Sequence, residues 1–342
     1  MSAITTTAPP AAQPGRGRRV TGLAVLVGVI AVLAVLSVAL GSRAMGLSEV
    51  WTGLTDPASD AYPVVTELRL PRTALGLAAG AALGLAGALM QAMTRNPLAD
   101  PGLLGVNTGA AAAVVTSVYF LGFSSFIGTL GFAFAGAAIA AVGCYLIAGA
   151  ASATPARLAL AGAAVTAAGF AYVSAIQILD TATLEQMRFW SVGSLVNAHT
   201  VPLRLVVGLI FAASVGGVLL ARPLNALALG DATATGLGVD PRVLRATGIA
   251  MITVLAGTAT AACGPIVFVG LVVPHIVRAF TGPDQNWVLP YSALAGSVFM
   301  LAADVLGRLL ARPAELQVGI VCAVAGGPFF LYLVSRRKVA RL

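Results

Sequence analysis

The sequence predicts an all-α membrane protein, a bundle of about ten helices that cross a lipid bilayer. Apolar residues form 58% of the 342-residue chain and charged residues only 9%, whereas a typical soluble domain is about 25% charged. The mean hydropathy is +0.95. Uncharged blocks of about 20 residues recur along the chain, and an α-helix needs this length to cross the hydrocarbon core. The function is therefore expected within the bundle and its loops.

Ten apolar runs separated by polar breaks mark the expected spans. They lie near residues 20–41, 73–93, 103–122, 126–149, 158–178, 202–220, 243–262, 264–281, 286–303 and 316–334. The seventh and eighth are the least sharply divided, because Gly264 and Pro265 interrupt the apolar sequence there. The first run is too long for the apolar region of a signal peptide, so we expect it to be retained as a span. We expect residues 1–19 to form a disordered cytoplasmic tail, residues 20–335 one ten-span domain, and residues 336–342 a basic cytoplasmic tail.

Basic residues are distributed unevenly between the two faces that ten crossings would create. An even number of crossings places both termini on one side, which we assign to the cytoplasm. Thirteen of the 20 basic residues then face the cytoplasm, as the positive-inside rule predicts: Arg16, Arg18, Arg19, Arg95, Arg157, Arg222, Arg242, Arg245, Arg278, Arg336, Arg337, Lys338 and Arg341. The net charge of +8 therefore indicates orientation and requires no nucleic-acid partner.

Several classes of enzyme and metal site are disfavoured by residues that the sequence lacks. Lys338 is the only lysine and lies in the C-terminal tail, so the sequence has no Walker A loop and any ATP dependence must come from another subunit. His199 and His275 form no metalloprotease motif, and the three cysteines occur singly in apolar surroundings. An intramembrane enzyme that uses Ser194 and His199 is a weak rival, because no third residue orients the pair. We predict no catalytic residue, no metal site and no cofactor bound by this chain.

Charged side chains are nearly absent from the predicted hydrocarbon depth. A proton- or sodium-driven secondary transporter usually keeps a carboxylate or histidine there, whereas Asp180, Asp304 and Arg308 map to the outer ends of spans. Asp304 and Arg308 lie four residues apart on one predicted helix, where they form either an interfacial ion pair or part of a docking site. The second span has a small-residue face that favours close helix packing over a substrate lining, at Gly76, Gly80, Gly84 and Gly87.

Five segments together resemble one family, the FecCD-type permeases of ABC importers for iron–siderophore complexes and cobalamin. They occur in the family's order and cover the chain from about residue 20 to its C-terminus. Each segment is modestly specific alone, and the set is highly specific. The segments are RLPR at 69–72, NPLADPGLLG at 96–105, LNALALGDATATGLGV at 224–239, GPIVFVGLVVPHIVR at 264–278, and the block from Asp304 to Phe330 that contains GGPFF.

The resemblance implies the type II ABC importer permease architecture, in which each ten-span subunit forms half of a channel in the bacterial cytoplasmic membrane. The implied partners are a second permease subunit, identical or related, two cytoplasmic ATPases that carry the ATP and Mg, and an extracytoplasmic substrate-binding protein. A ferric siderophore complex is the expected cargo. Cobalamin or haem import by the same architecture is an alternative, and an ion-coupled secondary transporter is the alternative from a different class.

The resemblance also implies roles for three groups of residues. Outward-facing arginines that would dock onto acidic residues of the binding protein are Arg69, Arg72 and Arg308, with interfacial snorkelling as the alternative. The loop that would fit a cleft in the ATPase contains Asn225, Leu229, Gly230, Asp231, Ala234, Gly236, Leu237, Gly238 and Val239. The inner end of the translocation path, or gate, would include Asn96, Pro97, Leu98, Ala99, Pro155 and Ala156.

Four positions depart from the family pattern. Pro155 and Ala156 occupy places that often bear hydroxyl groups, which weakens the gate assignment. Asp231 stands where a glutamate is more usual, and Gln317 stands where a proline is common. We expect only a local change at the start of the last span from Gln317.

Overall fold

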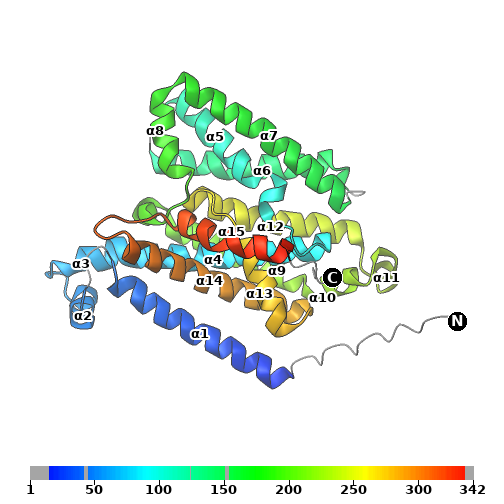
Figure 1. Ribbon diagram of the computed structural model, residues 1–342, viewed down its shortest axis with the longest axis horizontal. Coiled ribbons are helices and arrows are strands. Elements are labelled where there is room, and N and C mark those ends of the chain that lie inside the picture. Colours follow the sequence, from blue (N-terminus) through cyan, green and yellow to red (C-terminus); the bar gives the residue numbers. More distant parts are fainter. Residues whose placement is uncertain (1–14, 42–44, 124, 151–153, 336–342) are drawn as a thin grey trace.

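The computed structural model describes residues 15–41, 45–123, 125–150 and 154–335, and all regular structure within these ranges is helical (Figure 1). Residues 1–14 of the tail predicted at 1–19, and the whole tail predicted at 336–342, lie outside the described residues. The first half contains α1 (Arg16–Ala39), α2 (Leu47–Thr55), α3 (Ala61–Pro63), η1 (Val64–Arg69), α4 (Leu70–Thr94), η2 (Pro101–Leu104), α5 (Val106–Leu121), α6 (Phe126–Ile147) and α7 (Pro155–Leu179). The second half contains α8 (Thr181–Trp190), η4 (Val196–Thr200), α9 (Leu203–Leu219), α10 (Ala221–Ala228), α11 (Asp231–Gly236), α12 (Pro241–Cys263), α13 (Val269–Thr281), α14 (Gln285–Leu310) and α15 (Val318–Ser335).

The predicted bundle of about ten apolar helices is confirmed. Six helices are long and apolar enough to cross a membrane alone, and α9 with α10 forms a further candidate span bent by 44°. The shorter apolar helices α5, α13 and α15 complete the set. One boundary differs from the expectation: α1 begins at Arg16, so the basic residues at 16–19 extend the first helix and do not belong to a disordered tail. Arginine is a good helix former, which explains the extension.

Helix α4 lies at the centre of the bundle and packs against α9, α12, α13 and α14. Its glycines allow this close approach. A Cβ at Gly84 would lie 2.2 Å from the carbonyl oxygen of Ser292, and a Cβ at Gly80 would lie 2.4 Å from that of Gly296. The small-residue face predicted on this span therefore packs against neighbouring backbone.

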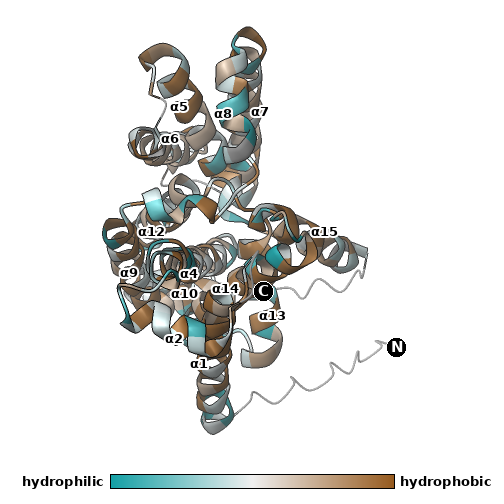
Figure 2. Ribbon diagram, turned by 90° about the vertical axis from the view of Figure 1, so that its left-hand side faces the viewer, coloured by the Kyte–Doolittle hydropathy of each residue, from teal (hydrophilic) through white to brown (hydrophobic). Residues whose placement is uncertain are grey.

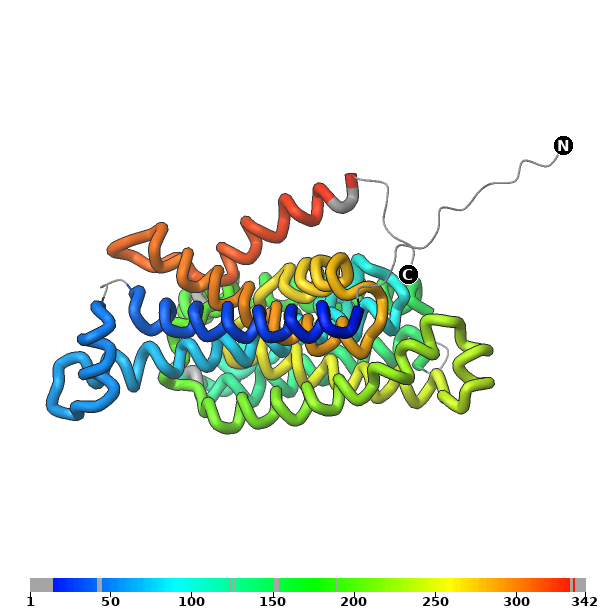
Figure 3. Tube along the Cα trace, turned by 90° about the horizontal axis from the view of Figure 1, so that it is seen from below, coloured from blue at the N-terminus to red at the C-terminus, as the bar shows by residue number. Residues whose placement is uncertain are grey.

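The remaining long helices lie around this centre in three places. Helices α5, α6 and α7 pack on one another and reach the central group mainly through α12, and Figure 2 shows them with α8 as a separate cluster. Helix α1 lies along α14 on the opposite side (Figure 1). Helix α15 packs against α13 and α14, and Figure 3 shows it diverging from the bundle toward its C-terminal end.

The eighth predicted span, 264–281, is helical only from Val269, which corrects the expectation of a continuous helix. Gly264 takes φ 74° and ψ 178°, a conformation that favours glycine, and Pro265 has no N–H to donate. The start of this non-helical segment is enclosed by protein, whereas Val267 near its end is 41% exposed. A Cβ at Gly264 would lie 2.2 Å from the carbonyl oxygen of Trp190, and Ser194 N–H donates to the Cys263 carbonyl at 2.7 Å. Such burial is what a bilayer requires of irregular backbone.

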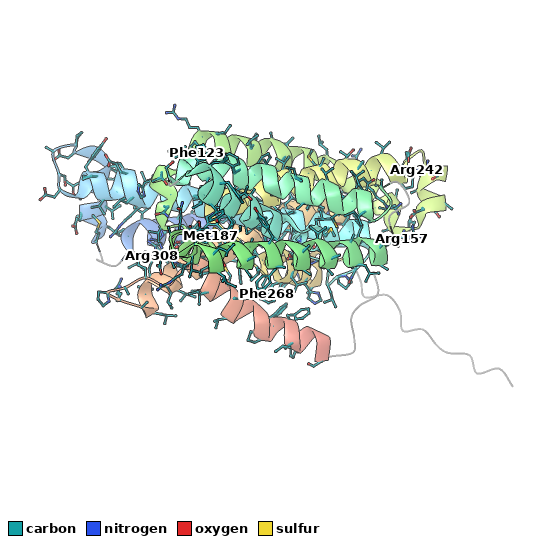
Figure 4. The ribbon with its side chains drawn as sticks, turned by 90° about the horizontal axis from the view of Figure 1, so that it is seen from above. Phe123, Arg157, Met187, Arg242, Phe268 and Arg308 are labelled. Carbon is teal, nitrogen blue, oxygen red and sulfur yellow. The ribbon has the colours of Figure 1, made fainter. Side chains whose placement is uncertain are left out.

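The two ends of the bundle carry different parts of the chain. Helices α2, α3 and α8 lie at one end, which we call the outer end, and α10 and α11 lie at the other, which we call the inner end (Figure 1). Figure 4 shows Arg157 and Arg242 together at the inner end and Arg308 toward the outer end. This separation agrees with the two groups of charged residues that the sequence predicts on opposite faces.

Candidate functional site

At the outer end, Arg69 holds the end of α1. Its Nη1 donates to the carbonyl oxygens of Val38 at 2.6 Å and Ala39 at 2.9 Å. These are among the last carbonyls of α1, which have no partner within the helix. A cation at a helix C-terminus is also favoured by the helix dipole. Arg69 is only 7% exposed, so it serves the interior of this chain.

Arg72, Asp304 and Arg308 form a buried charged cluster beside Arg69. Arg72 Nη2 lies 2.8 Å from Asp304 Oδ1, and Arg308 Nη2 lies 2.8 Å from Asp304 Oδ2. Arg72 Nη1 also pairs with Glu315 at 2.6 Å. Asp304 and Arg308 are 1% and 2% exposed. The expected pairing of these two residues is thus present, and the pair is buried within the protein.

Arg308 additionally joins α14 to α1. Its Nη1 donates to the Ser37 carbonyl at 2.8 Å, and its Nη2 donates to the Ser37 hydroxyl at 2.9 Å. The Ser37 hydroxyl also lies 2.8 Å from that of Thr73 on α4. The cluster therefore fixes α1, α4 and α14 relative to one another at the outer end.

Two adjoining cavities open at this end, and together we call them the outer vestibule. The first, about 730 Å³, contains Arg69, Arg72 and Arg308 in its wall with the acids Glu49, Asp60 and Glu315. The second, about 460 Å³, is lined by neutral polar groups that include Gln186, Ser194, Asn197 and Gln317. Val196 and Glu315 border both. The three arginines predicted for docking therefore meet in one wall, although their guanidinium groups are engaged within the chain, and their docking role stays a prediction.

At the inner end, Asp231 on α11 joins two other helices. Its Oδ1 lies 2.5 Å from Arg95 Nη2 at the end of α4, and its Oδ2 lies 2.7 Å from Arg245 Nη2 on α12. Burial raises the pKa of Asp231, but the hydrogen bonds and charges of Arg245 and Arg95 outweigh it and leave the pKa below its ordinary value. The carboxylate is therefore ionised at neutral pH and ties the loop to both helices.

The loop around α11 presents apolar side chains away from the bundle. Leu229 is 67% exposed and Leu237 is 62% exposed, although both lie in a polar segment. Gly230 takes φ 106° and Gly238 φ 82°, which turn the chain sharply before and after α11. Ala234 is fully buried and anchors α11 on the bundle, so it is not available to a partner. Gly236 is exposed and Val239 half-buried.

Asn225 connects the same loop to the start of α14. Its Nδ2 donates to Asp284 Oδ1 at 2.8 Å, and its Oδ1 accepts from Gln285 N–H at 2.9 Å. Burial raises the pKa of Asp284, but hydrogen bonds from Asn225 and Asn286 and the charge of Arg19 leave it below its ordinary value. Asn225 thus acts as a bridge between α10 and α14.

Only one of the two predicted gate segments lines an inner hollow of about 850 Å³. Pro155, the first residue of α7, lines it beside Arg95 and Asp231. Asn96, Pro97, Leu98 and Ala99 follow Arg95 but do not line it; they form a tight turn in which the Asn96 side chain accepts from Leu98 N–H at 3.0 Å. Ala99 is buried and Ala156 is exposed. The gate role of these residues stays a prediction.

A buried polar contact between α4 and α13 was not predicted. Pro274 lies inside α13 and has no N–H, so the carbonyl of Gly270, one turn earlier, lacks its helical donor. Gln91 supplies one: its Nε2 donates to the Gly270 and Leu271 carbonyls, each at 3.2 Å, and its Oε1 accepts from Arg278. Gln91 is fully buried. Two features of the sequence could have indicated this contact: Gln91 lies within an apolar helix, and Pro274 lies within an expected span.

Within the described ranges, no group of three His, Cys, Asp or Glu residues is arranged to hold a metal ion. The charged clusters of this site lie at the two ends of the bundle. The arrangement suits docking and mechanical linkage at each end.

Known proteins resemble this chain over most of its length. The sequence model of the FecCD transport family matches residues 29–336 of this chain. The ferric enterobactin transport system permease protein FepD of Escherichia coli (strain K12) is 43% identical over 310 residues, which are 88% of this chain and 91% of that protein. The hemin transport system permease protein HmuU of Yersinia pestis is 37% identical over 325 residues, 92% and 95% of the two chains. A solved metal-chelate type ABC transporter in an inward-facing conformation superposes with a TM-score of 0.81 at 28% identity, covering 93% of this chain and 99% of that one.

Proposed function

Because this chain belongs to the FecCD transport family, we propose that it is the membrane-spanning subunit of a binding-protein-dependent ABC importer for a ferric siderophore complex. The proposed cargo rests on one observation, the 43% identity to a ferric enterobactin permease over nearly the whole of both chains. We further propose that the chain lies in the bacterial cytoplasmic membrane with both termini inside, on the basis of its basic-residue distribution.

The proposed complex contains a second permease subunit, identical or related, two cytoplasmic ATPases and an extracytoplasmic binding protein. The sequence has one lysine and no phosphate-binding loop, so ATP and Mg belong to the ATPases. A permease of this kind needs no tight cargo site. A wall that bound a ferric complex strongly would retain it, and selectivity then rests with the binding protein.

Docking at the outer vestibule is proposed to replace one carboxylate partner of Arg72 by another. Glu315 borders the cavity and its side chain is 26% exposed. Its carboxylate lies 2.6 Å from Arg72 Nη1. An acidic residue of the binding protein could take the place of Glu315, because a guanidinium has several donors for carboxylates. Arg69 and Arg308 would position Arg72 and would not themselves form the contact surface.

Coupling at the inner end is proposed to pass through Asp231. Leu229 and Leu237 are suited to an apolar cleft on the ATPase, since exposed leucines in a polar loop leave apolar area for a partner. Movement of α11 would be passed by the Asp231 ion pairs to Arg95, and Arg95 directly precedes the predicted gate residues Asn96–Ala99. Pro155 borders the same hollow and would respond to the same movement.

The proposal is tested by uptake of iron-labelled siderophore. The chain would be expressed with its cognate ATPase and binding protein in cells that lack their own permeases of this type. ATP-dependent uptake of a ferric siderophore that excess haem and cobalamin do not inhibit is expected. Uptake that persists after ATP depletion while a proton gradient remains would overturn the proposal in favour of an ion-coupled transporter.

Haem is the second candidate cargo. It is favoured by the 37% identity to a haemin permease over 92% of this chain. The same uptake assay separates the two, because haem import would be inhibited by unlabelled haem and unaffected by a ferric siderophore. Cobalamin import by the same architecture would be identified by the corresponding competition.

A further inference from the structure

A groove on the outside of the bundle lies between α1 and the pair α13 and α14, at the inner end. Its volume is about 580 Å³, within the range of about 300–1,000 Å³ for small-molecule sites. Val25 and Leu26 on α1 form one wall, and Ile276 and Phe280 on α13 form the other. Val25 is 59% exposed and Phe280 is 70% exposed, so the groove opens away from the bundle.

The groove runs from a basic end into apolar surroundings. Arg18 and Arg19 border it at the start of α1, and Leu26 lies eight residues further along the helix. At about 1.5 Å per residue, these positions are about 12 Å apart along the helix axis. The length of α1 and its lack of charged residues beyond Arg19 place the apolar part within the hydrocarbon region. The basic end then lies at the depth of lipid headgroups.

The floor of the groove is preformed. The Tyr291 hydroxyl on α14 donates to the Arg19 carbonyl at 2.5 Å, which pins the first turn of α1. A Cβ at residue 22 would lie 2.2 Å from that hydroxyl, so Gly22 is needed for α1 to approach α14 this closely. The groove is therefore present without any movement of α1.

The two bordering arginines differ in what they contact. Arg19 is 9% exposed, lies 3.9 Å from Asp284 and stacks 5.6 Å above the Trp287 ring. Arg18 and Arg16 are exposed and form no ion pair with the described part of the chain. The groove is thus bordered by one exposed guanidinium group, that of Arg18, and Arg16 adds a second positive charge two residues earlier on the same helix.

We propose that this groove binds an anionic phospholipid of the inner leaflet, with one acyl chain along Val25 and Phe280 and the phosphate at Arg18, where the nearby charge of Arg16 adds to the attraction. Basic clusters at the cytoplasmic end of membrane helices attract acidic headgroups. An apolar protein partner would fill the channel but leave the charge of Arg18 without a counter-ion. A single lipid matches both features, because it is charged at one end and apolar along its length.

Two contacts connect the site to the inner-end loop. Arg19 follows Arg18 directly and pairs with Asp284, and Asp284 accepts a hydrogen bond from Asn225 on α10. An acidic headgroup beside Arg18 would compete with Asp284 for Arg19. Anionic lipid would thereby influence the loop proposed to contact the ATPase. The binding itself depends only on the chain spanning a membrane and is independent of its cargo.

Trp287 provides a direct probe of occupancy. The other two tryptophans, Trp51 and Trp190, would be replaced by phenylalanine, and the full chain reconstituted in vesicles of phosphatidylcholine. Brominated phosphatidylglycerol or brominated phosphatidylcholine would then be added at equal mole fraction, and quenching of Trp287 fluorescence measured. We expect at least threefold stronger quenching by the anionic lipid. Equal quenching by the two lipids would refute the site.

Charge and shape are tested separately by substitution. Arg16→Gln with Arg18→Gln should abolish the preference for phosphatidylglycerol, whereas Arg157→Gln, which removes an exposed inner-end arginine far from the groove, should leave it intact. Val25→Phe fills the channel from a lipid-facing position and should reduce quenching by both lipids. An unchanged preference in the double variant would overturn the proposal.

A second copy of the chain is the competing occupant. Disulfide crosslinking between Val25→Cys copies, together with weak quenching by either lipid, would assign the groove to a subunit interface and overturn the lipid proposal. Absence of siderophore uptake alongside a persistent phosphatidylglycerol preference would refute the proposed cargo alone.

Discussion

Arg72 on α4 and Asp304 on α14, 232 positions apart in the sequence, are joined by two hydrogen bonds, from Nε at 3.1 Å and from Nη2 at 2.8 Å to the same carboxylate oxygen. Asp304 also pairs with Arg308, so one buried carboxylate contacts two guanidinium groups. Glu315 supplies the second negative charge from the rim of the vestibule. The outer end is therefore held by a charged cluster that is neutral as a set.

Removal of the central carboxylate should be costly. Asp304→Asn would leave Arg72 and Arg308 buried with too little negative charge, and breaking a buried ion pair costs about 3–5 kcal/mol. Thermal unfolding of the detergent-solubilised chain would show a clearly lower midpoint. The control is Glu185→Gln, which breaks an exposed pair of 3.4 Å and should change stability by less than about 1 kcal/mol. Equal midpoints for the two variants would contradict the structural role of Asp304.

Glu315 and Arg72 should affect docking in opposite directions. Glu315→Gln removes the internal competitor for Arg72 and is expected to tighten binding of the cognate binding protein several-fold. Arg72→Gln should weaken binding. Affinities would be measured by surface plasmon resonance on the permease complex in nanodiscs, with Glu185→Gln as the control. Docking through Arg72 would be disproved by weaker binding in Glu315→Gln.

Asp231→Asn should loosen the inner-end loop and uncouple ATP hydrolysis from transport. The amide keeps the size of the side chain but loses the charge that holds Arg95 and Arg245. We expect siderophore uptake to fall several-fold while ATP hydrolysis by the assembled complex continues. Thr233→Ala, a change at an exposed position of the same helix, is the control. Full uptake in Asp231→Asn would show that the ion pairs transmit nothing.

The pH dependence of this contact follows from the lowered pKa of Asp231. A carboxyl with a lower pKa in the folded state contributes stability above its unfolded pKa, whose ordinary value is 3.8. The contribution is lost as the pH falls through the lower, folded pKa. The loop contact should thus be constant from neutral pH down to about pH 5 and weaken only in stronger acid. Hydrogen exchange of α11 would be measured across this pH range. Faster exchange that begins above about pH 5 would contradict the lowered pKa of Asp231.

Gln91 and Pro274 should be energetically coupled. Gln91→Met leaves the Gly270 carbonyl and the Arg278 guanidinium without their partner, and an unsatisfied buried polar group costs about 1–3 kcal/mol. Pro274→Ala restores an N–H that can donate to Gly270. The double variant should therefore lose less stability than the two single variants predict together, and a double-mutant cycle measures the difference. Additive losses would refute the coupling.

A methyl group at Gly84 should disrupt the centre of the bundle. Its Cβ would lie 2.2 Å from the Ser292 carbonyl oxygen, and overpacking of this kind costs about 1–3 kcal/mol or more. Gly131→Ala on α6 is the matched control, since a Cβ there meets nothing within 4 Å. That variant should be neutral or slightly stabilised, because alanine is the better helix former by about 1 kcal/mol. Folded yield and unfolding midpoint would be compared in both variants.

The sequence alone predicted the membrane bundle, the number of apolar helices and their approximate limits. These features follow from the length of apolar runs and the small residues at 76, 80, 84 and 87, and both are local in the chain. The resemblance of short motifs identified the family. It also placed Arg69, Arg72 and Asp231 in segments that the structure puts at opposite ends of the bundle.

Only the tertiary structure decided what these residues contact. The four-residue spacing suggested the Asp304–Arg308 pair, but the contact of Arg308 with Ser37 joins segments 271 positions apart, and no local pattern reports such a distance. The same holds for Gln91 and the carbonyl freed by Pro274, and for the groove in which α1 meets α13. The apolar length and the charge count of a segment decide whether it crosses the bilayer, because each helix must match the hydrocarbon core by itself. Contacts between polar groups are decided by the packing of helices against one another, because each buried donor must find its acceptor across that packing.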